Sequence, residues 1–181
     1  MDETGNTVVA VILIVLYLIG ITLCAYYMSA YNKKKCDKCC KCIKKYNCNW
    51  ITWTGGEPLD QLTSDIVDFF KPYKQAIETS GIHSPPNNLD WVVLSPKINE
   101  KNILKKFKLR KDNFHCDELR WVKKISDEIP NTKIKAKKYY ISPHFHKDDV
   151  DYKNLNWCIK LCLDNPKWSL SMQQHKIWKI K

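Results

Sequence analysis

Residues 50–58 read WITWTGGEP, and this stretch predicts the kind of fold that the chain adopts. Its first half is rich in aromatic and β-branched residues, which is typical of a buried strand. The two adjacent glycines that follow let a backbone turn sharply or let a ligand approach the main chain closely. An ordinary turn at the end of a strand and a ligand-binding turn both satisfy this pattern, so the rest of the chain has to decide between them.

Beyond this stretch, predicted strands alternate with helices and loops. Strands are predicted where β-branched and aromatic residues gather, and helices where apolar residues recur at helical spacing. Such alternation is typical of an α/β fold with a largely parallel sheet. Cys158 and Cys162 share one helix face and are interpreted as small buried hydrophobic residues. The predicted strands are 50–54, 75–78, 89–94, 137–141 and 168–172, the predicted helices are 65–70 and 152–163, and 118–122 fits either element.

Five of the predicted strands end in polar or glycine-containing segments. The carboxyl ends of parallel strands meet at one edge of a sheet, and ligands of α/β proteins bind at that edge. We therefore interpret TGGEP as part of a ligand site rather than as an isolated turn. The five segments are TGGEP at 54–58, ETSG at 78–81, SPK at 95–97, ISP at 141–143 and QHK at 174–176.

A hydrophobic segment precedes the predicted domain. Residues 8–28 hold no charged side chain over 21 positions, which is the length that crosses a bilayer as a helix. No basic residue comes before this segment, so a cleaved signal peptide is not favoured. Seven lysines between residues 33 and 45 follow it, and the positive-inside rule then places the domain in the cytosol. We predict a single transmembrane anchor over 1–31, a Lys/Cys-rich linker over 32–49 and the domain over 50–181.

The charge of the chain is strongly asymmetric. All 30 Lys and Arg residues lie after residue 31, together with 17 of the 19 acidic residues, which leaves a surplus of 13 positive charges there. This surplus suits an anionic membrane surface. Nucleic acid is not expected as a partner, because no aromatic–basic pattern of a known RNA module is present. Residues 101–111 (KNILKKFKLRK) hold six basic residues, and either a solvated face or a polyanion site accounts for them.

The chain has nine cysteines, and the eight that follow the predicted span lie on the side predicted to face the cytosol, which favours reduced thiols or metal ligands over a disulfide framework. Five of them lie between residues 36 and 48. Cys36 and Cys40 form a CX3C pair, and Cys39 and Cys42 form a CX2C pair. Four interpretations stay open: a rearranged iron–sulfur site, a zinc site with Cys ligands, palmitoylation near the membrane, and a linker without a ligand.

These strand ends, in this order, resemble those of the 7-carboxy-7-deazaguanine synthases, the radical S-adenosylmethionine (SAM) enzymes of the queuosine pathway. The likeness covers about 130 residues, from 50 to 181. GGEP is shared by many radical SAM proteins, whereas its combination with LDWVVLSPK and WSLSMQQHK is specific to this family. The matching segments are TGGEP at 54–58, IETSG at 77–81, LDWVVLSPK at 89–97, DELR at 117–120, YISP at 140–143 and NPKWSLSMQQHK at 165–176.

The resemblance implies a partial radical SAM (β/α) barrel, here without its first β/α unit and preceded by one transmembrane helix. The barrel of this family binds a [4Fe–4S] cluster, SAM and Mg²⁺. The family reduces SAM to a 5′-deoxyadenosyl radical, which takes a hydrogen from 6-carboxy-5,6,7,8-tetrahydropterin. Ring contraction with loss of ammonia, a carbon–nitrogen lyase reaction, then gives 7-carboxy-7-deazaguanine. The alternative is a membrane-anchored SAM- or metal-binding protein without catalysis, or a truncated reading frame.

The resemblance also implies roles for individual residues. Thr54 and Lys181 would contact the substrate, and Cys36, Cys40 and Cys42 would bind the cluster. The cysteines here do not chain into the family's CX3CX2C loop, and no Cys-Asp-Thr, whose Thr binds Mg²⁺ in the family, follows them. The expected partners are a pterin substrate, the membrane through residues 8–28, and a second copy of the chain as a homodimer. The SAM-binding residues would be Gly56, through its main chain, and Ser95, Pro96, Lys97, Ser142 and Pro143.

Overall fold

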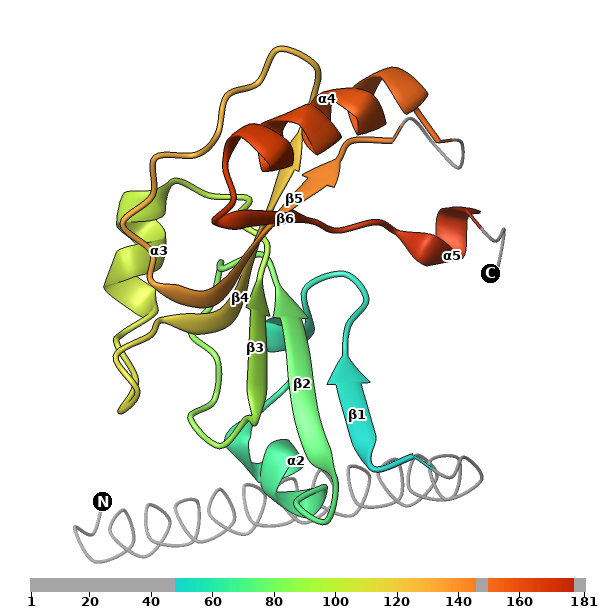
Figure 1. Ribbon diagram of the computed structural model, residues 1–181. Coiled ribbons are helices and arrows are strands. Elements are labelled where there is room, and N and C mark those ends of the chain that lie inside the picture. Colours follow the sequence, from blue (N-terminus) through green and yellow to red (C-terminus); the bar gives the residue numbers. More distant parts are fainter. Residues whose placement is uncertain (1–47, 146–149, 178–181) are drawn as a thin grey trace, which may run out of the picture. The chain divides into compact units, whose positions relative to one another are not determined.

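The computed structural model describes residues 48–145 and 150–177 (Figure 1). Within these ranges, no helix has both the length and the apolar character needed to cross a membrane. Several sequence predictions fall outside the described ranges: the span over residues 8–28, the candidate cluster ligands Cys36, Cys40 and Cys42, and Lys181.

Six parallel strands form one sheet, in the order β1-β2-β3-β4-β5-β6. Each strand adds beside the one before it, which is the winding of a (β/α) barrel rather than that of a doubly wound sheet. The predicted α/β fold with a parallel sheet is confirmed, and the ambiguous residues 118–122 belong to a strand. The strands are β1 Trp50–Trp53, β2 Lys74–Thr79, β3 Trp91–Leu94, β4 Cys116–Lys123, β5 Ala136–Pro143 and β6 Trp168–Leu170.

Helices connect three of the strand pairs. α2 (Ser64–Phe69) follows β1, α3 (Glu100–Lys106) follows β3, and α4 (Tyr152–Asp164) follows β5. The basic segment 101–111 is helical over residues 101–106, which belong to α3. Two short helices complete the described elements: the 3-10 helix η1 (Pro58–Asp60) and α5 (Gln174–Ile177). The side chains that cap the first turns of the three connecting helices belong to Thr63, Asn99 and Asp151.

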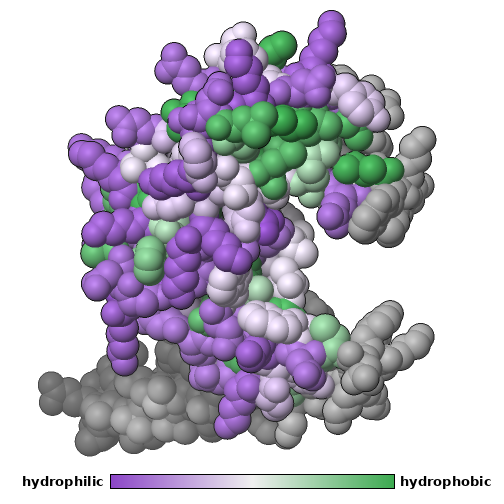
Figure 2. Space-filling view, in the orientation of Figure 1, coloured by the Kyte–Doolittle hydropathy of each residue, from purple (hydrophilic) through white to green (hydrophobic). Residues whose placement is uncertain are grey.

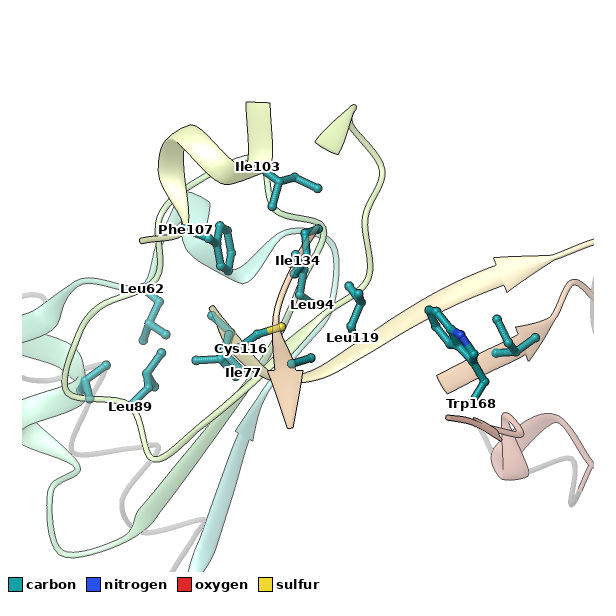
Figure 3. Close-up of a cluster of buried hydrophobic side chains, with 14 of the residues drawn as sticks. Leu62, Ile77, Leu89, Leu94, Ile103, Phe107, Cys116, Leu119, Ile134 and Trp168 are labelled. Carbon is teal, nitrogen blue, oxygen red and sulfur yellow. The ribbon is translucent and has the colours of Figure 1, made fainter. Parts of the chain in front are cut away.

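One face of the sheet carries the hydrophobic core (Figure 3). Ile77, Leu94 and Leu119 lie on neighbouring strands and are fully buried. Ile103 of α3 and Phe107, directly after it, cover these side chains (Figure 3). Residues of α2 and α4 belong to the same cluster, so the three connecting helices pack on one face of the sheet. Each such aliphatic side chain contributes about 1.5–3 kcal/mol when it leaves water.

The cysteines of α4 pack in this core, as the sequence predicted. Cys158 is fully buried, and Cys162 is partly buried against the same cluster. Burial raises the pKa of the Cys158 thiol to about 11 and that of Cys116 to about 12. Because a metal binds the thiolate form, a raised pKa makes Cys116 and Cys158 poor candidates for cluster ligands.

A buried charge network holds the amino end of β4. The Asp117 side chain has no exposed surface, and its carboxylate accepts a 2.8 Å hydrogen bond from the N–H of Val92. Arg110 donates to both carboxylate oxygens at 2.7 and 2.9 Å, and Lys137 lies 2.9 Å away. Burial raises the pKa of Asp117, but these donors lower it more, so the pKa falls to about 2. The network joins β3, β4, β5 and the loop before β4.

We expect Asp117→Asn to lower the free energy of unfolding by about 3 kcal/mol near neutral pH, because it leaves the charges of Arg110 and Lys137 without their buried counter-ion. The pKa of Asp117 is depressed in the folded state, so the stabilisation is present above the unfolded pKa of about 3.9 and is lost as the pH falls towards 2. Urea unfolding of both proteins over this pH range measures the difference.

Asp112→Asn is the matched control. Asp112 contacts the same two basic side chains, but it lies on the surface, so its loss should have a much smaller effect. Equal destabilisation by the two variants, or a difference that does not shrink in acid, would contradict the role given to the buried carboxylate.

Candidate functional site

The face of the sheet opposite to the three helices carries polar and charged side chains. The strand register places Glu78 of β2 beside Val93 of β3, and Val93 beside Glu118 of β4. Two residues further along β4, Arg120 lies beside Tyr140 of β5. Registered neighbours in a sheet direct their side chains to the same face, and so do residues two apart in one strand. Glu78, Glu118 and Arg120 therefore share the face that the core residues do not use.

Arg120 joins two carboxylates on this face. Its Nη1 donates to Oε1 of Glu78 at 2.9 Å, and its Nε and Nη2 donate to Oε2 of Glu118 at 3.0 and 2.7 Å. The other oxygen of Glu118 accepts a 3.0 Å hydrogen bond from the indole N–H of Trp91. The Arg120 guanidinium lies 5.9 Å from the centre of the Tyr140 ring. Glu118 is nearly enclosed, whereas 42% of the Glu78 side chain is exposed, so Glu78 is the carboxylate that a ligand can reach.

We call Glu78, Glu118 and Arg120 the polar row. Thr54 extends the polar row to the end of β1. Its hydroxyl lies 3.5 Å from the second oxygen of Glu78, which is the long limit of a hydrogen bond. Thr54 is exposed, and it immediately precedes the glycine turn. The residue assigned to the substrate by resemblance therefore lies beside a solvent-accessible carboxylate.

The turn after Thr54 has a backbone that requires glycine. Gly55 and Gly56 have φ values of +95° and +63°, in the region that residues with side chains rarely adopt. A Cβ atom built at either position meets no heavy atom within 4 Å. The glycines are thus needed for the backbone conformation, and the space beside their main chain is open to a ligand. This arrangement fits the main-chain contact with SAM that the resemblance implies for Gly56.

Glu57 fastens this turn to the adjacent strand. Its carboxylate accepts hydrogen bonds from the Thr79 hydroxyl at 2.8 Å, from the Ser80 N–H at 2.9 Å and from the Ser80 hydroxyl. It also accepts from the N–H of Leu59 at 3.3 Å, at the start of η1. Burial raises the pKa of Glu57, but these donors lower it more, so the pKa lies below its ordinary value. The acidic residue of GGEP is thus explained as an anchor for the turn.

The segment after β3 lies at the same edge and is tied to β2. The N–H of Ser95 donates to the carbonyl of Thr79 at 2.8 Å, and the N–H of Lys97 donates to the carbonyl of Ser80 at 3.1 Å. Thr79 and Ser80 also hold Glu57, so three successive strand ends form one connected rim. The structure brings the TGGEP turn and the predicted residues Ser95, Pro96 and Lys97 to this rim.

Ser142 and Pro143 lie further along the sheet. They are the last two residues of β5, which β4 separates from β3. Both are buried, and Ser142 is only 8% exposed. Ser142 is two residues after Tyr140, so it shares the face with the Arg120 network. The two residues reach the carboxyl edge, but among the described residues no main-chain hydrogen bond joins them to the rim, whereas one joins Lys97 to Ser80.

The part of the chain that the structure describes contains no group of three or more His, Cys, Asp or Glu residues placed to bind a metal ion. The candidate ligands Cys36, Cys40 and Cys42 lie outside that part, and so does Lys181. Sequence reasoning assigned no role to Glu78, Glu118 or Arg120. Residues two apart in a strand share a face, so Glu118 and Arg120 of the DELR motif could have been predicted to lie side by side once this segment was assigned to a strand.

A parallel sheet wound in one direction, with a glycine turn at its carboxyl edge, defines an α/β protein with a singly wound sheet. Comparisons with known proteins give a family. The chain is 33% identical over 149 residues to 7-carboxy-7-deazaguanine synthase from Haemophilus influenzae, a match that covers 75% of this chain and 67% of the relative. The chain belongs to the 7-carboxy-7-deazaguanine synthase family.

Two further relatives have the same name. The synthase from Buchnera aphidicola subsp. Schizaphis graminum is 33% identical over 148 residues, covering 77% of this chain and 64% of its own length. The synthase from Bordetella pertussis is 29% identical over 133 residues, covering 70% of this chain and 57% of its own length. The chain thus spans less than two thirds of these two relatives.

No family model matches the chain. A comparison with solved structures found the crystal structure of QueE from Escherichia coli, with 21% identity and a TM-score of 0.48. That match covers 72% of this chain and 59% of the other.

We expect Glu57→Ala to lower the free energy of unfolding by about 2 kcal/mol, because it leaves several donors of the rim without their acceptor. Thermal unfolding at neutral pH measures the loss. The depressed pKa of Glu57 means that its contribution is present above the unfolded pKa and is lost as the pH falls through the folded pKa.

Glu128→Ala removes an exposed carboxylate elsewhere and serves as the control, with little expected effect. If both variants melt at the temperature of the unaltered protein, Glu57 does not anchor the rim.

Proposed function

We propose that this domain binds SAM and serves the conversion of 6-carboxy-5,6,7,8-tetrahydropterin to 7-carboxy-7-deazaguanine, in queuosine and 7-deazapurine biosynthesis. Membership of the family supports the reaction class. The observation that carries the proposal is the open main chain at Gly55 and Gly56, fixed by Glu57 at the carboxyl edge of the sheet. Ligands of parallel α/β proteins bind at that edge.

The proposed SAM site follows the rim. Gly56 would accept or donate through its main chain to the amino-acid end of SAM, where a side chain would occupy the open space. Lys97 is exposed, and its ammonium group suits the carboxylate of the SAM methionine. Ser95 and Pro96 would line the ribose side. Ser142 and Pro143 would bound the site at β5, with burial that leaves them a steric rather than a polar role.

The proposed substrate site is the polar row beside this rim. Glu78 presents an exposed carboxylate, which accepts hydrogen bonds from ring N–H groups such as those of a pterin. Arg120 fixes the position of Glu78 by a 2.9 Å hydrogen bond. Thr54 adds a hydroxyl next to Glu78, and Lys181 is the further substrate residue that the resemblance implies.

SAM held at a reduced [4Fe–4S] cluster, with Mg²⁺ beside it, would supply the radical that starts the reaction. Cys36, Cys40 and Cys42 are the proposed cluster ligands. One observation favours a second candidate function, a membrane-anchored SAM-binding protein without turnover: the three cysteines do not form the CX3CX2C order of the family. For both candidates, we propose a single-pass membrane protein whose domain faces the cytosol and pairs with a second copy.

We expect Gly56→Val to abolish SAM binding in calorimetry while the far-ultraviolet circular dichroism spectrum stays the same. Gly56 has a φ of +63°, so a β-branched residue forces the turn away from its conformation. Asn113→Val is the matched control, because Asn113 has a φ of +64° but lies at the other end of the sheet. The control should bind SAM normally. Unchanged SAM affinity in Gly56→Val would reject the assignment.

Turnover is tested with the chain reconstituted anaerobically with iron and sulfide, then given the pterin substrate, SAM, Mg²⁺ and a reductant. Because the cysteine spacing differs from CX3CX2C, we expect little bound cluster and little 7-carboxy-7-deazaguanine from the chain alone. The opposite result is 5′-deoxyadenosine that disappears when Cys36, Cys40 and Cys42 are changed to Ala. It would establish a rearranged cluster loop and exclude the non-catalytic candidate.

A further inference from the structure

A basic pocket of about 660 Å³ lies at the amino ends of β3, β4 and β5, the edge opposite to the candidate SAM site. The loop before β3, the loop between α3 and β4, and Lys137 of β5 line it. The side of the molecule formed by α3 and the following loop is largely hydrophilic (Figures 1 and 2). The side chains that line the pocket include the acidic groups of Asp90 and Asp112 and a larger number of basic groups, those of Lys106, Lys108, Arg110, Lys111 and Lys137.

The positive charges of this surface are only partly neutralised. Arg110 and Lys137 are paired with Asp112 and Asp117. Lys108 and Lys111 are exposed and form no ion pair with any residue in the described ranges, and the same holds for Lys105 on α3. We call residues 105–111 the basic loop. Lys108 and Lys111 line the pocket, and with Lys105 they leave a positive charge that an anionic partner from outside the domain can neutralise.

The basic loop also exposes an apolar side chain from a fixed backbone. Leu109 is 49% exposed between Lys108 and Arg110. The chain is anchored on both sides of it, by Phe107 in the core and by the two hydrogen bonds from Arg110 to buried Asp117. A turn closes the loop, because the N–H of Arg110 donates to the carbonyl of Phe114 at 2.9 Å. A preformed loop loses little conformational entropy when it docks.

We propose that the basic loop docks on an anionic phospholipid bilayer, with Leu109 in the interface and the free lysines at the headgroups. An exposed aliphatic side chain among lysines suits the boundary between headgroups and acyl chains. A single-stranded RNA surface would instead use exposed aromatic side chains for base stacking, and no exposed large aromatic residue of the described ranges lies on this loop. The inference rests on the proposed membrane span at residues 8–28. A linker of about 20 residues then keeps the domain within about 70 Å of the bilayer.

The test uses the full chain in nanodiscs of phosphatidylcholine alone or of phosphatidylcholine with phosphatidylserine. Hydrogen–deuterium exchange followed by mass spectrometry reports on residues 105–113. We expect exchange there to slow about tenfold or more in the discs with phosphatidylserine, since each basic residue near an anionic surface raises affinity about fivefold. The triple variant Lys105→Glu, Lys108→Glu, Lys111→Glu should lose this slowing, and Leu109→Asn should reduce it.

The matched control reverses three exposed lysines on the α4 side of the domain, Lys153→Glu, Lys160→Glu and Lys167→Glu, and should keep the slowing. SAM binding of the basic-loop variant should be unchanged, because its lysines lie at the opposite edge from the rim, so failure of the docking and failure of the SAM site are distinguishable. Equal exchange in the two kinds of disc, with the chain inserted, overturns the proposal. A chain that does not insert into either disc overturns the span on which the proposal rests, and slowing by added RNA but not by phosphatidylserine assigns the loop to a polyanion instead.

Discussion

Each strand of this sheet lies parallel to the strand that follows it in the chain, and this winding gives the sheet two unlike faces. A right-handed crossover returns the chain on one side of the sheet, and successive crossovers that advance in one direction use the same side. The helices and the hydrophobic core therefore share one face, which Ile77 and Leu119 represent. The other face keeps polar side chains, and Arg120 joins Glu78 and Glu118 there. The same winding brings all the strand ends to one edge, where a ligand can use both the polar face and the loops.

Two carboxylates, one at each edge of the sheet, hold the loops there in place. Glu57 accepts hydrogen bonds from the end of β2 and so fixes the glycine turn at the carboxyl edge. Asp117 binds Arg110 and Lys137 and so fixes the basic loop at the amino edge. Each carboxylate has a lowered pKa for the same reason, since the hydrogen-bond donors around it outweigh the cost of burial. The candidate SAM site and the proposed membrane surface are thus held by separate interactions on opposite edges.

Sequence patterns located five of the six strands, the parallel sheet and the TGGEP turn, because strand composition and glycine conformation are local properties, whereas β4 fitted a helix equally well. The role of Glu57 was not found, because its partners Thr79 and Ser80 follow another strand and only the sheet register brings them near. Arg120 and Glu78 are 42 residues apart and meet for the same reason. α3 was not predicted, because the basic residues of 101–111 were interpreted as a solvated face or a polyanion site. Ile103 and Phe107 nevertheless have the spacing of a buried helix face.

We propose that SAM binds at the rim formed by the ends of β1, β2 and β3. Hydrogen–deuterium exchange of the full chain with and without saturating SAM tests it most directly. We expect slower exchange in residues 54–57, 78–81 and 95–97, with the basic loop unchanged. Slowing confined to other segments, or no slowing at the rim although calorimetry shows SAM to be bound, would contradict it.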